Sequence, residues 1–520
     1  MRIKNTLLNV SAGLLNQLII TVLSFVSRTV FINSLGVDYL GVNALFTSLL
    51  AMLTLTEAGI GSSIVYNLYK PVAERNRLKV LALMKLYRNT YRIIFIVVMA
   101  LGLAALPFLD LIAGEAGVEH LEWVYLLFLA NTAVPYLFVY KHSYLNVNQK
   151  NYIVTLAYSL ASILSTSVRI AILFYTENYL LYLLVDTVIT IATSIVLARM
   201  VDRKYPYLRF GAADTLDTET KASFIKNMKA IFLQNVGAYF IFGVESILIS
   251  TFISITAVGI YANYKMLIDI SRTFLNQVFS SMYHSVGNLV AKESKDKIFQ
   301  VYKVMLLLNF WLYSLLAIGM YLLIQPLISV WLGPKFLMEQ WILVVLIAMF
   351  YERGMRNTIT TVKTTAGIFH EDRYAPIFQA VLNLALSYFF LQSYGLIGVF
   401  MGGFASALAV PFWTTPMLVY KKVFHKPLRL YYMTYFLYGL AGLAALFASR
   451  ALIGLLPGTS FLTLAAQGVM VVLTVNTIYL LLFFRTSEFA YLLSIALSFA
   501  SKFAPLRNRL PVRLLQTLKK

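Results

Sequence analysis

The hydrophobic positions of this chain form long runs separated by short polar segments, and most runs are longer than a buried strand or an ordinary core helix. A helix that crosses a membrane needs about 20 mostly apolar residues, because each backbone amide must find its hydrogen bond within the helix where there is no water. The runs therefore predict an all-α polytopic membrane protein with 14 transmembrane helices. With edges placed to within a few residues, the expected spans are 6–33, 39–69, 90–112, 121–145, 151–174, 179–201, 228–254, 256–286, 301–331, 339–362, 374–392, 394–420, 430–450 and 459–484.

Composition agrees with this class. Hydrophobic residues make up 60% of the chain and charged residues 12%, with a mean hydropathy of +0.76. Soluble domains are about half apolar and about a quarter charged. The chain has no cysteine, which excludes disulfides and thiolate metal sites.

The placement of the charges predicts the orientation. A net charge of +21 would suggest a nucleic-acid partner for a soluble protein. Here most of the 43 Lys and Arg residues fall at the amino terminus, in alternate loops and in the carboxyl tail. Because Lys and Arg prefer the cytoplasmic side of a membrane, we expect both termini in the cytoplasm and no nucleic-acid partner. The opposite face carries an acidic loop: Asp110, Glu115, Glu119 and Glu122.

One segment recurs along the chain. Arg28 to Lys79 contains the end of one apolar run, a short turn, a second apolar run with a glutamate inside it, and a basic exit. Ser246 to Lys297 follows the same plan, and sliding one copy over the other aligns Gly41 with Gly259. The repeat predicts two pseudo-symmetric six-helix lobes related by an axis along the membrane normal, able to rock against each other around a central site.

The repeat and the longest basic connection together predict the domain organisation. The expected parts are an N-lobe with spans one to six (1–205), a cytoplasmic inter-lobe linker (206–226), a C-lobe with spans seven to twelve (227–421), two extra C-terminal helices (422–485) and a basic amphipathic cytoplasmic tail (486–520). The mixed basic and apolar residues of the tail suit a helix lying on an anionic leaflet. A solvated basic tail is the alternative.

Charged residues inside the expected spans are the candidates for function, because a charge near the bilayer centre costs about 2.5–3.5 kcal/mol on insertion scales. Arg28 and Arg169 lie near the outer ends of their spans, where a long side chain can extend to water. That interpretation is favoured for Arg169 and open for Arg28, which belongs to the repeated unit. Glu57 lies too deep for this, so a cavity-facing, ion-coupling role is favoured over a buried partner for a cation. Asp186 and Glu245 are lone acids for which pairing and ion coupling are equally good interpretations.

Two later spans carry cations beside acids at helical spacing, so that one face of each helix holds them all. They are Lys265, Asp269 and Arg272 in span eight and Glu352, Arg353 and Arg356 in span ten. In each helix one positive charge remains after internal pairing. A cationic lining for an anionic ligand is favoured over a structural seam of ion pairs.

Several chemistries have no motif in the sequence. It contains no Walker GK[ST] sequence, no GxSxG and no HExxH, and its 5 histidines never come within metal-ligand spacing of one another. We therefore expect no cofactor, no metal site and no enzymatic activity.

The segment Leu35 to Glu74 reads LGVDYLGVNALFTSLLAMLTLTEAGIGSSIVYNLYKPVAE. In its order of LG, YLG, E-x-GIG and LYKP it resembles the polysaccharide-transporter (Wzx-type flippase) family of the multidrug/oligosaccharidyl-lipid/polysaccharide exporter superfamily. The resemblance implies a bacterial plasma-membrane protein that flips an undecaprenyl-diphosphate-linked oligosaccharide from the inner to the outer leaflet by alternating access through a cationic cavity. It also implies a role in capsule or exopolysaccharide synthesis, with membrane lipids around the protein and a polysaccharide polymerase and glycosyltransferases as candidate partners.

The resemblance and the charges at span depth together define a predicted site. The expected substrate-binding residues are Arg28, Lys265, Arg272, Arg353 and Arg356, and the expected ion-coupling residues are Glu57, Asp269 and Glu352. Guanidinium groups suit a diphosphate because they bind phosphate oxygens in pairs. No catalytic residue is expected.

Other functions remain open at this stage. A cation or drug antiporter of the same superfamily would be expected to have an acidic or aromatic cavity and only twelve spans. A lipid II or teichoic acid precursor flippase would have a similar cavity. A membrane polymerase or ligase would resemble chains with a large outer loop, whereas the outer connections here are short. A purely structural role is disfavoured by the charges at midplane depth.

Overall fold

The computed structural model describes residues 2–54, 60–114, 117–148, 150–210, 243–368 and 371–503. Every regular element in these ranges is a helix. Ten of the described helices are long and apolar enough to cross a membrane, and Val37–Leu53 and Gly243–Phe252 are shorter apolar helices. Helices α12 (Ile255–Lys292) and α14 (Gln340–Thr365) are long but carry the charges singled out above. Each expected span overlaps a helix, so the chain is a multi-pass helical membrane protein, compatible with the predicted count.

Packing divides the chain into two compact units, which we describe separately. Unit 1 comprises Met1–Ile270 and Arg373–Pro411, and unit 2 comprises Ser271–Asp372 and Phe412–Lys520. This grouping follows internal contacts and differs from the expected boundary at 206–226, so the two lobes stay a prediction. Helix α12 runs through the boundary between the units.

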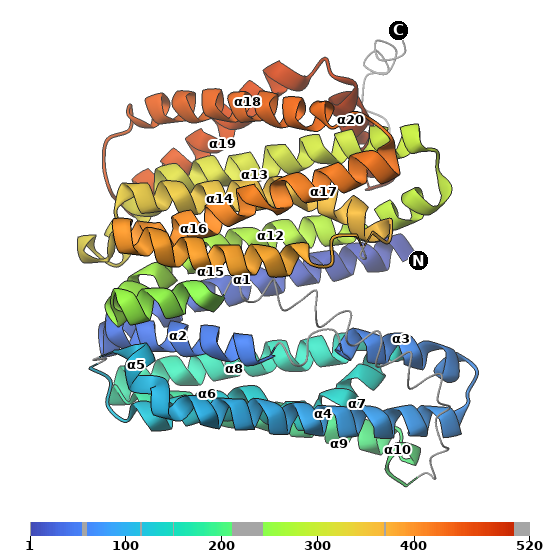
Figure 1. Cartoon of the computed structure of the whole chain (residues 1–520), viewed down its shortest axis with the longest axis vertical. Coiled ribbons are helices and arrows are strands. Elements are labelled where there is room, and N and C mark those ends of the chain that lie inside the picture. The colour runs from blue at the N-terminus through green and yellow to red at the C-terminus, as the bar shows by residue number, and fades with distance from the viewer. Residues whose placement is uncertain are drawn as a thin grey trace. The chain divides into compact units, whose positions relative to one another are not determined.

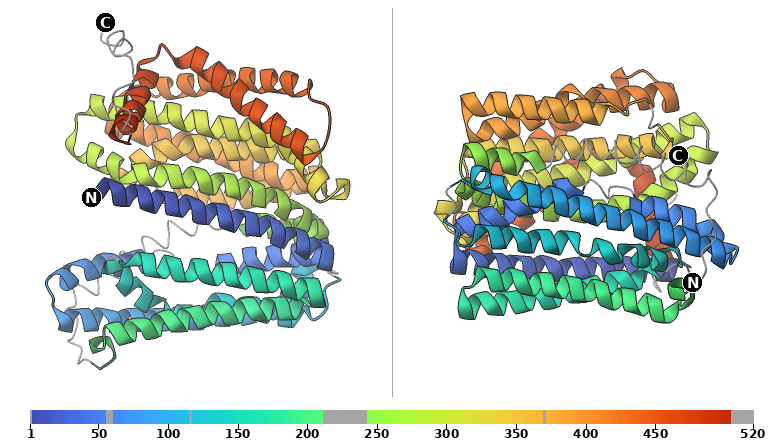
Figure 2. Two further views of the ribbon diagram at one scale, coloured as in Figure 1. Left: turned by 180° about the vertical axis from the view of Figure 1, so that it is seen from behind. Right: turned by 60° about the horizontal axis from the view of Figure 1, so that its bottom comes forward.

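The helices of unit 1 are long and mostly run alongside one another (Figure 1). They are α1 (Arg2–Leu35), α2 (Val37–Leu53), α3 (Ile60–Ala73), α4 (Arg77–Ala105), α5 (Leu109–Ala113), α6 (Leu121–Ala133), α7 (Tyr136–Val147), α8 (Asn151–Thr176), α9 (Tyr179–Lys204), α10 (Tyr207–Phe210), the first part of α12, α15 (Ala375–Tyr394) and α16 (Leu396–Ala409). Helices α8 and α9 lie side by side in both views of the unit (Figures 1 and 2).

Prolines lie at the ends of several helices. Helix α4 ends at Ala105, just before Pro107, and α6 ends at Ala133, just before Pro135. Pro411 begins α17 (Pro411–Val419) after α16 ends at Ala409. A proline has no backbone N–H and its ring collides with the preceding turn, so a helix breaks most easily there. Pro326 and Pro416, by contrast, lie inside α13 (Lys295–Trp331) and α17.

A close crossing of α2 and α12 organises unit 1. A Cβ atom built on Gly41 would lie 2.1 Å from the carbonyl oxygen of Ile255, and one built on Gly259 would lie 2.3 Å from that of Val37. Two helix backbones can approach this closely only where both residues at the crossing lack a side chain. Near the crossing, the Thr256 hydroxyl donates a hydrogen bond of 2.5 Å to the Asp38 carboxylate. The sequence repeat pairs Gly41 with Gly259, so equivalent positions of the two copies meet here.

An aromatic cluster joins α1, α2 and α9 at one end of unit 1. Helices α1 and α2 are connected through Gly36, whose φ of 90° is a conformation that favours glycine. The ring of Phe31 meets those of Tyr179 and Tyr182 edge-on at 5.7 and 5.4 Å, and Tyr39 meets Tyr179 at 5.1 Å. All but Tyr39 are buried, so the three helix ends are held in a defined arrangement.

Unit 2 packs around α13. Its other helices are the end of α12, α14, α17, α18 (Arg429–Ile453), α19 (Phe461–Phe483) and α20 (Ser487–Phe503), with short turns at Pro334–Phe336 and Tyr420–Phe424. The fully buried Phe310 ring stacks on Tyr438 at 4.6 Å and lies 4.9 Å from Tyr479. The Tyr479 hydroxyl donates to Ser314 at 2.8 Å, so this buried polar group is satisfied within the core.

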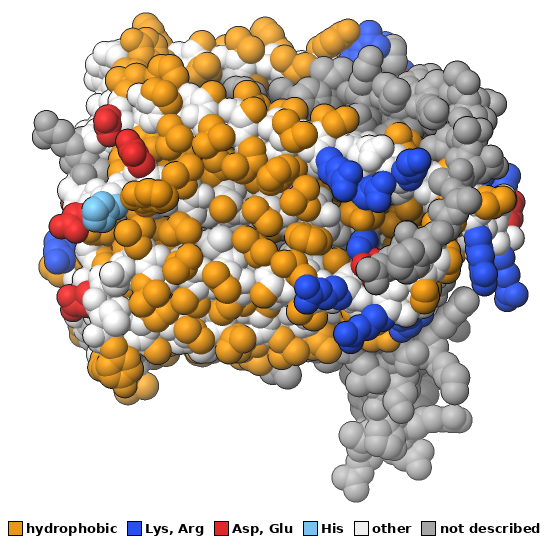
Figure 3. Space-filling view, turned by 90° about the horizontal axis from the view of Figure 1, so that it is seen from below, with side chains coloured by type: hydrophobic (Ala, Val, Ile, Leu, Met, Phe, Trp, Pro, Cys, Tyr) orange, Lys and Arg blue, Asp and Glu red, His pale blue; other side chains and the backbone are white. Residues whose placement is uncertain are grey.

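The surface of unit 1 has the band expected of a membrane protein. In the view of Figure 3, hydrophobic side chains cover the middle of the face, Lys and Arg gather at one end, and Asp and Glu at the other. Exposed apolar residues of α4 and α9 include Ile93, Ile96, Val188 and Val196. Exposed groups of this kind are stable in contact with lipid. The separation of charge agrees in pattern with the predicted orientation of the chain, which stays a prediction.

The glycine crossing generates a test. Gly41→Leu is expected to lower the melting temperature of the detergent-solubilised protein, because the new side chain meets a backbone carbonyl that cannot move aside. Overpacking of this kind costs about 1–3 kcal/mol. Gly439→Leu is the matched control, since a Cβ on Gly439 meets no atom within 4 Å. Equal melting temperatures for the two variants, measured by tryptophan fluorescence, would contradict the close crossing.

Candidate functional site

Two neighbouring pockets in unit 1 gather polar side chains at membrane depth. The larger has a volume of about 440 Å³ and the smaller about 230 Å³. Asn43 and Arg169 line both. The remaining lining residues of the larger pocket are Thr47, Leu50, Ala51, Thr54, Leu127, Phe128, Asn131, Thr132, Leu183, Asp186 and Thr187, and those of the smaller are Ser24, Ser27, Arg28, Phe31, Leu40, Thr166, Tyr182 and Met266.

Three charged residues reach the same depth from three helices. Arg28 lies seven residues before the end of α1 at Leu35, Arg169 seven before the end of α8 at Thr176, and Asp186 seven after the start of α9 at Tyr179. At a rise of about 1.5 Å per residue, each lies about 10 Å along its helix from that end. They therefore form a shared layer of charge inside the apolar part of the unit.

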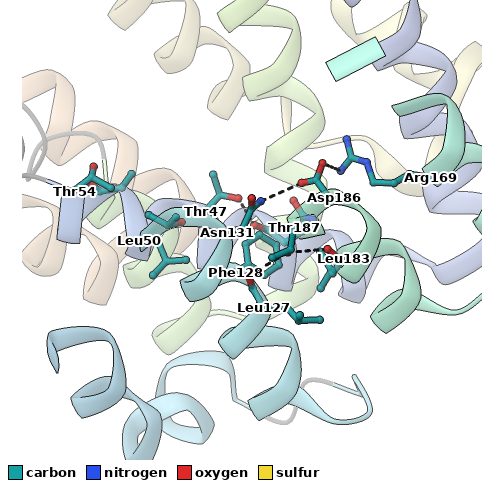
Figure 4. A pocket seen from close by; sticks show the side chains of 13 residues that line it. Thr47, Leu50, Thr54, Leu127, Phe128, Asn131, Arg169, Leu183, Asp186 and Thr187 are labelled. Atoms are coloured by element: carbon teal, nitrogen blue, oxygen red, sulfur yellow. Dashed lines mark hydrogen bonds and ion pairs between the residues drawn. The ribbon is translucent and has the colours of Figure 1, made fainter. Parts of the chain in front are cut away.

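Asp186 is bound from three sides. Its carboxylate accepts hydrogen bonds from Ser165 at 2.6 Å and Asn131 at 3.1 Å, and Nη1 of Arg169 lies 3.6 Å away. Figure 4 shows the Asp186 side chain between those of Asn131 and Arg169. A carboxylate at this depth is costly unless it is paired and hydrogen-bonded, and here it is both. The lone acid of the sequence is therefore a paired acid in the structure.

Arg169 does not extend to the surface as expected. Its side chain is 19% exposed, and besides the contact with Asp186 its guanidinium lies 4.8 Å from the centre of the Tyr182 ring. Nη1 also donates to the Tyr182 hydroxyl at 3.3 Å. The neighbouring carboxylate and aromatic ring stabilise the guanidinium more than extension of the side chain to water would. Both electrostatic interactions are stronger in a poorly solvated site.

Arg28 lines the smaller pocket without such neutralisation. Its Nη1 atom is buried and has no hydrogen-bond partner. Among the described residues no carboxylate forms an ion pair with Arg28, whereas Arg169 has Asp186. The charged side chains that line the two pockets are thus two arginines and one aspartate. The site carries a surplus positive charge together with an unused hydrogen-bond donor.

The amide and hydroxyl groups of the larger pocket come mainly from α2, α6 and α9. Asn43 and Thr47 lie one turn apart on α2, Thr54 follows the end of that helix, and Asn131 adds its amide from α6. Sequence reasoning based on charges alone missed these residues. Their signal was present as polar positions at helical spacing within an apolar span, a pattern that places them on one stripe.

The first part of α12 carries a further cation, Lys265, which is next in sequence to a residue of the smaller pocket. Met266 lines that pocket, and the adjacent Lys265 forms an ion pair of 3.5 Å with Asp269 one turn later. The two side chains are 35% and 41% exposed. Half-exposed pairs of this kind contribute about 0.2–1 kcal/mol, so Lys265 exchanges Asp269 for another anion at little cost.

Four of the remaining predicted residues lie in unit 2: Arg272, Glu352, Arg353 and Arg356. Arg356 donates two hydrogen bonds to the buried Glu352 carboxylate, one of them from Nη2 to Oε2 at 3.0 Å. Arg272 and Arg353 both lie within electrostatic reach of Tyr313. Tyr313 itself packs against Gly354, where a Cβ atom would lie 2.0 Å from the ring. Glu57 lies outside the described residues.

The predicted site is therefore only partly assembled within each unit. Arg28 shares a pocket with Arg169, which was not part of the predicted site, while Lys265 and Asp269 pair with each other on α12. In unit 2, Arg272 and Arg353 lie within electrostatic reach of Tyr313, and Arg356 pairs with Glu352. In the part of the chain that the structure describes, no group of three His, Cys, Asp or Glu residues could hold a metal ion.

Comparison with known proteins adds the fold class. No family model and no curated protein matches the sequence. Among solved structures, the lipid II flippase MurJ in an inward closed conformation aligns with a TM-score of 0.62 at 14% identity, covering 90% of this chain and 98% of that one. An inward-facing multidrug-resistance MATE transporter of the MOP superfamily aligns with a TM-score of 0.55 at 14% identity, covering 77% and 94%. A mutant of the Vibrio cholerae MATE transporter VcmN gives 0.54 at 15%, covering 82% and 98%. At these identities the likeness shows the fold alone: the chain has the fold shared by MurJ and the MATE transporters of the MOP superfamily.

Proposed function

We propose that the protein flips an undecaprenyl-diphosphate-linked oligosaccharide from the inner to the outer leaflet of a bacterial plasma membrane, for the synthesis of cell-surface polysaccharide. Transport proceeds by alternating access through a cationic cavity, with both termini in the cytoplasm. The observation that carries this proposal is the Arg28 guanidinium, which lies at membrane depth beside a polar pocket with an unused donor. The protein acts as a transporter and not as an enzyme. Glycosyltransferases assemble the lipid-linked oligosaccharide before it is flipped, and a polymerase joins the units afterwards.

The surplus positive charge suits a diphosphate. An anion entering a poorly solvated pocket gains more from a nearby guanidinium than it would in water. Arg28 has an N–H group that can donate to a phosphate oxygen. Lys265 forms only a weak ion pair with Asp269 and is adjacent in sequence to the pocket residue Met266. Arg169 adds a second guanidinium whose charge is offset by Asp186. The diphosphate therefore binds at the Arg28 end of the site.

The larger pocket suits the first sugar of the oligosaccharide. Its volume of about 440 Å³ falls in the range of about 300–1,000 Å³ typical of small-molecule sites, so it holds one part of the substrate and not the whole lipid-linked chain. Asn43, Thr47 and Asn131 offer the amides and hydroxyls that sugar hydroxyls bind, and Phe128 offers an apolar face. Asp186, already satisfied by two hydrogen bonds and an ion pair, orients Asn131 and Arg169.

The extent of structural similarity favours a flippase over a drug antiporter. The alignment with MurJ covers 90% of this chain, against 77% and 82% for the two MATE structures. An antiporter cavity is also expected to be acidic or aromatic, whereas the charged lining here has a surplus arginine. A precursor of lipid II or teichoic acid type remains an alternative cargo, since each carries the same diphosphate.

The class of cargo can be tested in the source bacterium. Deletion of the gene is expected to abolish surface polysaccharide and to accumulate the lipid-linked precursor in the inner leaflet, measured by lipid extraction and mass spectrometry. Normal polysaccharide with heightened drug sensitivity would contradict the flippase proposal and support the antiporter.

Arg28→Gln should lower transport while the protein still inserts. Loss of a charge-assisted hydrogen bond to phosphate, worth about 1.5–3 kcal/mol, predicts at least a tenfold fall in precursor flipping. Arg28→Lys keeps the charge without the paired donors and is expected to be intermediate. Lys335→Gln, an exposed lysine in the turn Pro334–Phe336, is the control. Wild-type flipping by Arg28→Gln at equal membrane abundance would remove Arg28 from the site.

The Glu352 and Arg356 pair allows two roles to be separated. Glu352→Gln leaves a buried guanidinium unpaired and is expected to destabilise the protein by about 3–5 kcal/mol, seen as a lower melting temperature. The double variant Glu352→Gln with Arg356→Met removes both charges and is expected to recover stability. If the ion pair only stabilises unit 2, the double variant recovers flipping together with stability. If Glu352 couples ions and Arg356 binds substrate, the double variant is stable but inactive.

An ion gradient is the proposed energy source, with Glu57 as the first candidate for coupling. In proteoliposomes, collapsing all ion gradients with ionophores should stop net flipping. Glu57→Gln should flip equally slowly with and without a gradient, because an amide cannot exchange a proton or bind a cation as a carboxylate does. Unchanged wild-type transport without any gradient would contradict this proposal.

A further inference from the structure

A second polar cavity lies in unit 2, between the beginning of α13 and the beginning of α20. Its volume is about 280 Å³, just below the usual range of small-molecule sites, so it matches a ligand the size of a lipid headgroup. Its polar and aromatic lining residues are Lys297, Gln300, Lys303, Ser487, Glu488 and Tyr491. Figure 1 places α20 beside the end of α13 that carries these lysines.

Helix α20 is held against α13 by two different contacts. The Phe489 ring stacks on Trp311 with centroids 6.0 Å apart and planes 17° from parallel. Nζ of Lys303 donates a 2.6 Å hydrogen bond to Oε1 of Glu488. An apolar and a charged contact on adjacent residues of α20 give the cavity fixed walls.

The cavity has one positive charge in surplus. Partial burial raises the pKa of Glu488, but hydrogen bonds from Lys303 and from its own backbone outweigh burial and hold that pKa below its usual value. Glu488 is therefore ionised and balances Lys303. Lys297 has no carboxylate partner among the described residues, and its ammonium lies 5.9 Å from the centre of the Tyr491 ring. The Ser487 hydroxyl donates a 3.1 Å hydrogen bond to Oε2 of Glu488, so the lining offers the Lys297 ammonium group next to the neutral amide of Gln300.

The position of the cavity matches the membrane surface. The apolar run of α13 begins at Val304, immediately after Lys303, so these lysines stand where the hydrocarbon ends. On α20, the partly exposed side chains of Tyr491 and Ile495 lie one turn apart and give the helix an apolar stripe toward its surroundings. A helix with an apolar face and basic neighbours lies stably at the boundary between headgroups and acyl chains.

We propose that the cavity formed by Lys297, Gln300, Lys303 and the start of α20 binds the phosphate of an anionic phospholipid headgroup. Lys297 meets the phosphate, and the Gln300 amide donates to a headgroup oxygen. Lys303 is shared between the phosphate and Glu488. The bound lipid ties α20 to the end of α13 and anchors it in the leaflet. This inference does not depend on the cargo that the protein carries.

Lipid binding can be measured on the full-length protein by native mass spectrometry after titration with phosphatidylglycerol or phosphatidylcholine. Phosphatidylglycerol is expected to bind in preference, and Lys297→Gln to weaken it about fivefold, the contribution of one basic residue at an anionic surface. Lys295→Gln is the matched control, because Lys295 is an exposed lysine two positions away that does not line the cavity. Equal weakening by both variants, or equal binding of the two lipids, would overturn the proposal.

Two further arms test the details. Glu488→Gln is expected to strengthen phosphatidylglycerol binding, because it removes the carboxylate that competes for Lys303; unchanged or weaker binding with α20 still docked, judged by the Trp311 fluorescence, would contradict a shared Lys303. Inorganic phosphate at millimolar concentration is expected to leave the lipid bound. Displacement of the lipid by free phosphate would show a site for a small anion and overturn the assignment to lipid.

Discussion

The crossing of α2 and α12 at Gly41 and Gly259 brings two helix backbones closer than any pair of side chains would allow. In a bilayer this contact cannot be driven by the hydrophobic effect, because lipid tails are as apolar as the helices, so close packing must supply the stabilisation. The hydrogen bond between Thr256 and Asp38 adds a polar contact near the same crossing. From this point α2 carries Asn43 and Thr47 into the larger pocket, and α12 carries Met266 to the smaller one.

The same constraint explains why the polar site lies where it does. With the ends of α1, α2 and α9 held by Phe31, Tyr179 and Tyr182, a layer of charge about two turns inward falls on neighbouring helices at one level. Each charge must then find a partner or face a cavity, because the surrounding hydrocarbon offers neither water nor counterion. Asp186 accepts two hydrogen bonds and forms an ion pair with Arg169, whereas Arg28 has a buried donor without a partner. The unneutralised charge and unused donor of Arg28 favour the binding of an anion in the pocket.

In unit 2, one buried charge is neutralised by a partner on the same helix and another charge by a docked terminal helix. Glu352 and Arg356 satisfy each other on a single helix, one turn apart, and a dense aromatic core around Phe310 and Tyr302 surrounds α13. Pairs separated by four residues form without help from the rest of the fold, so this one is set within α14 itself. The contact between Lys303 and Glu488 joins residues far apart in the chain and exists only because α20 docks on α13. Charges in this unit therefore serve both local helix stability and the attachment of a terminal helix.

Sequence reasoning reached the class and the helical segments, because runs of about 20 apolar residues act locally. It also aligned Gly41 with Gly259, though not their contact. It misjudged Arg169, since the distance of a residue from a span end says nothing of a carboxylate on the next helix. It passed over Asn43, Thr47 and Asn131, whose neutral side chains stand out less than charges in an apolar run.

By itself, the sequence determined that the chain is a helical membrane protein and which residues are too polar for their surroundings, because hydrophobicity is a property of each segment alone. Only the tertiary structure decided that Arg28 and Arg169 share a pocket while Arg356 is occupied by Glu352. That decision depends on which faces of different helices meet, and the meeting of faces is set by packing between segments far apart in the chain.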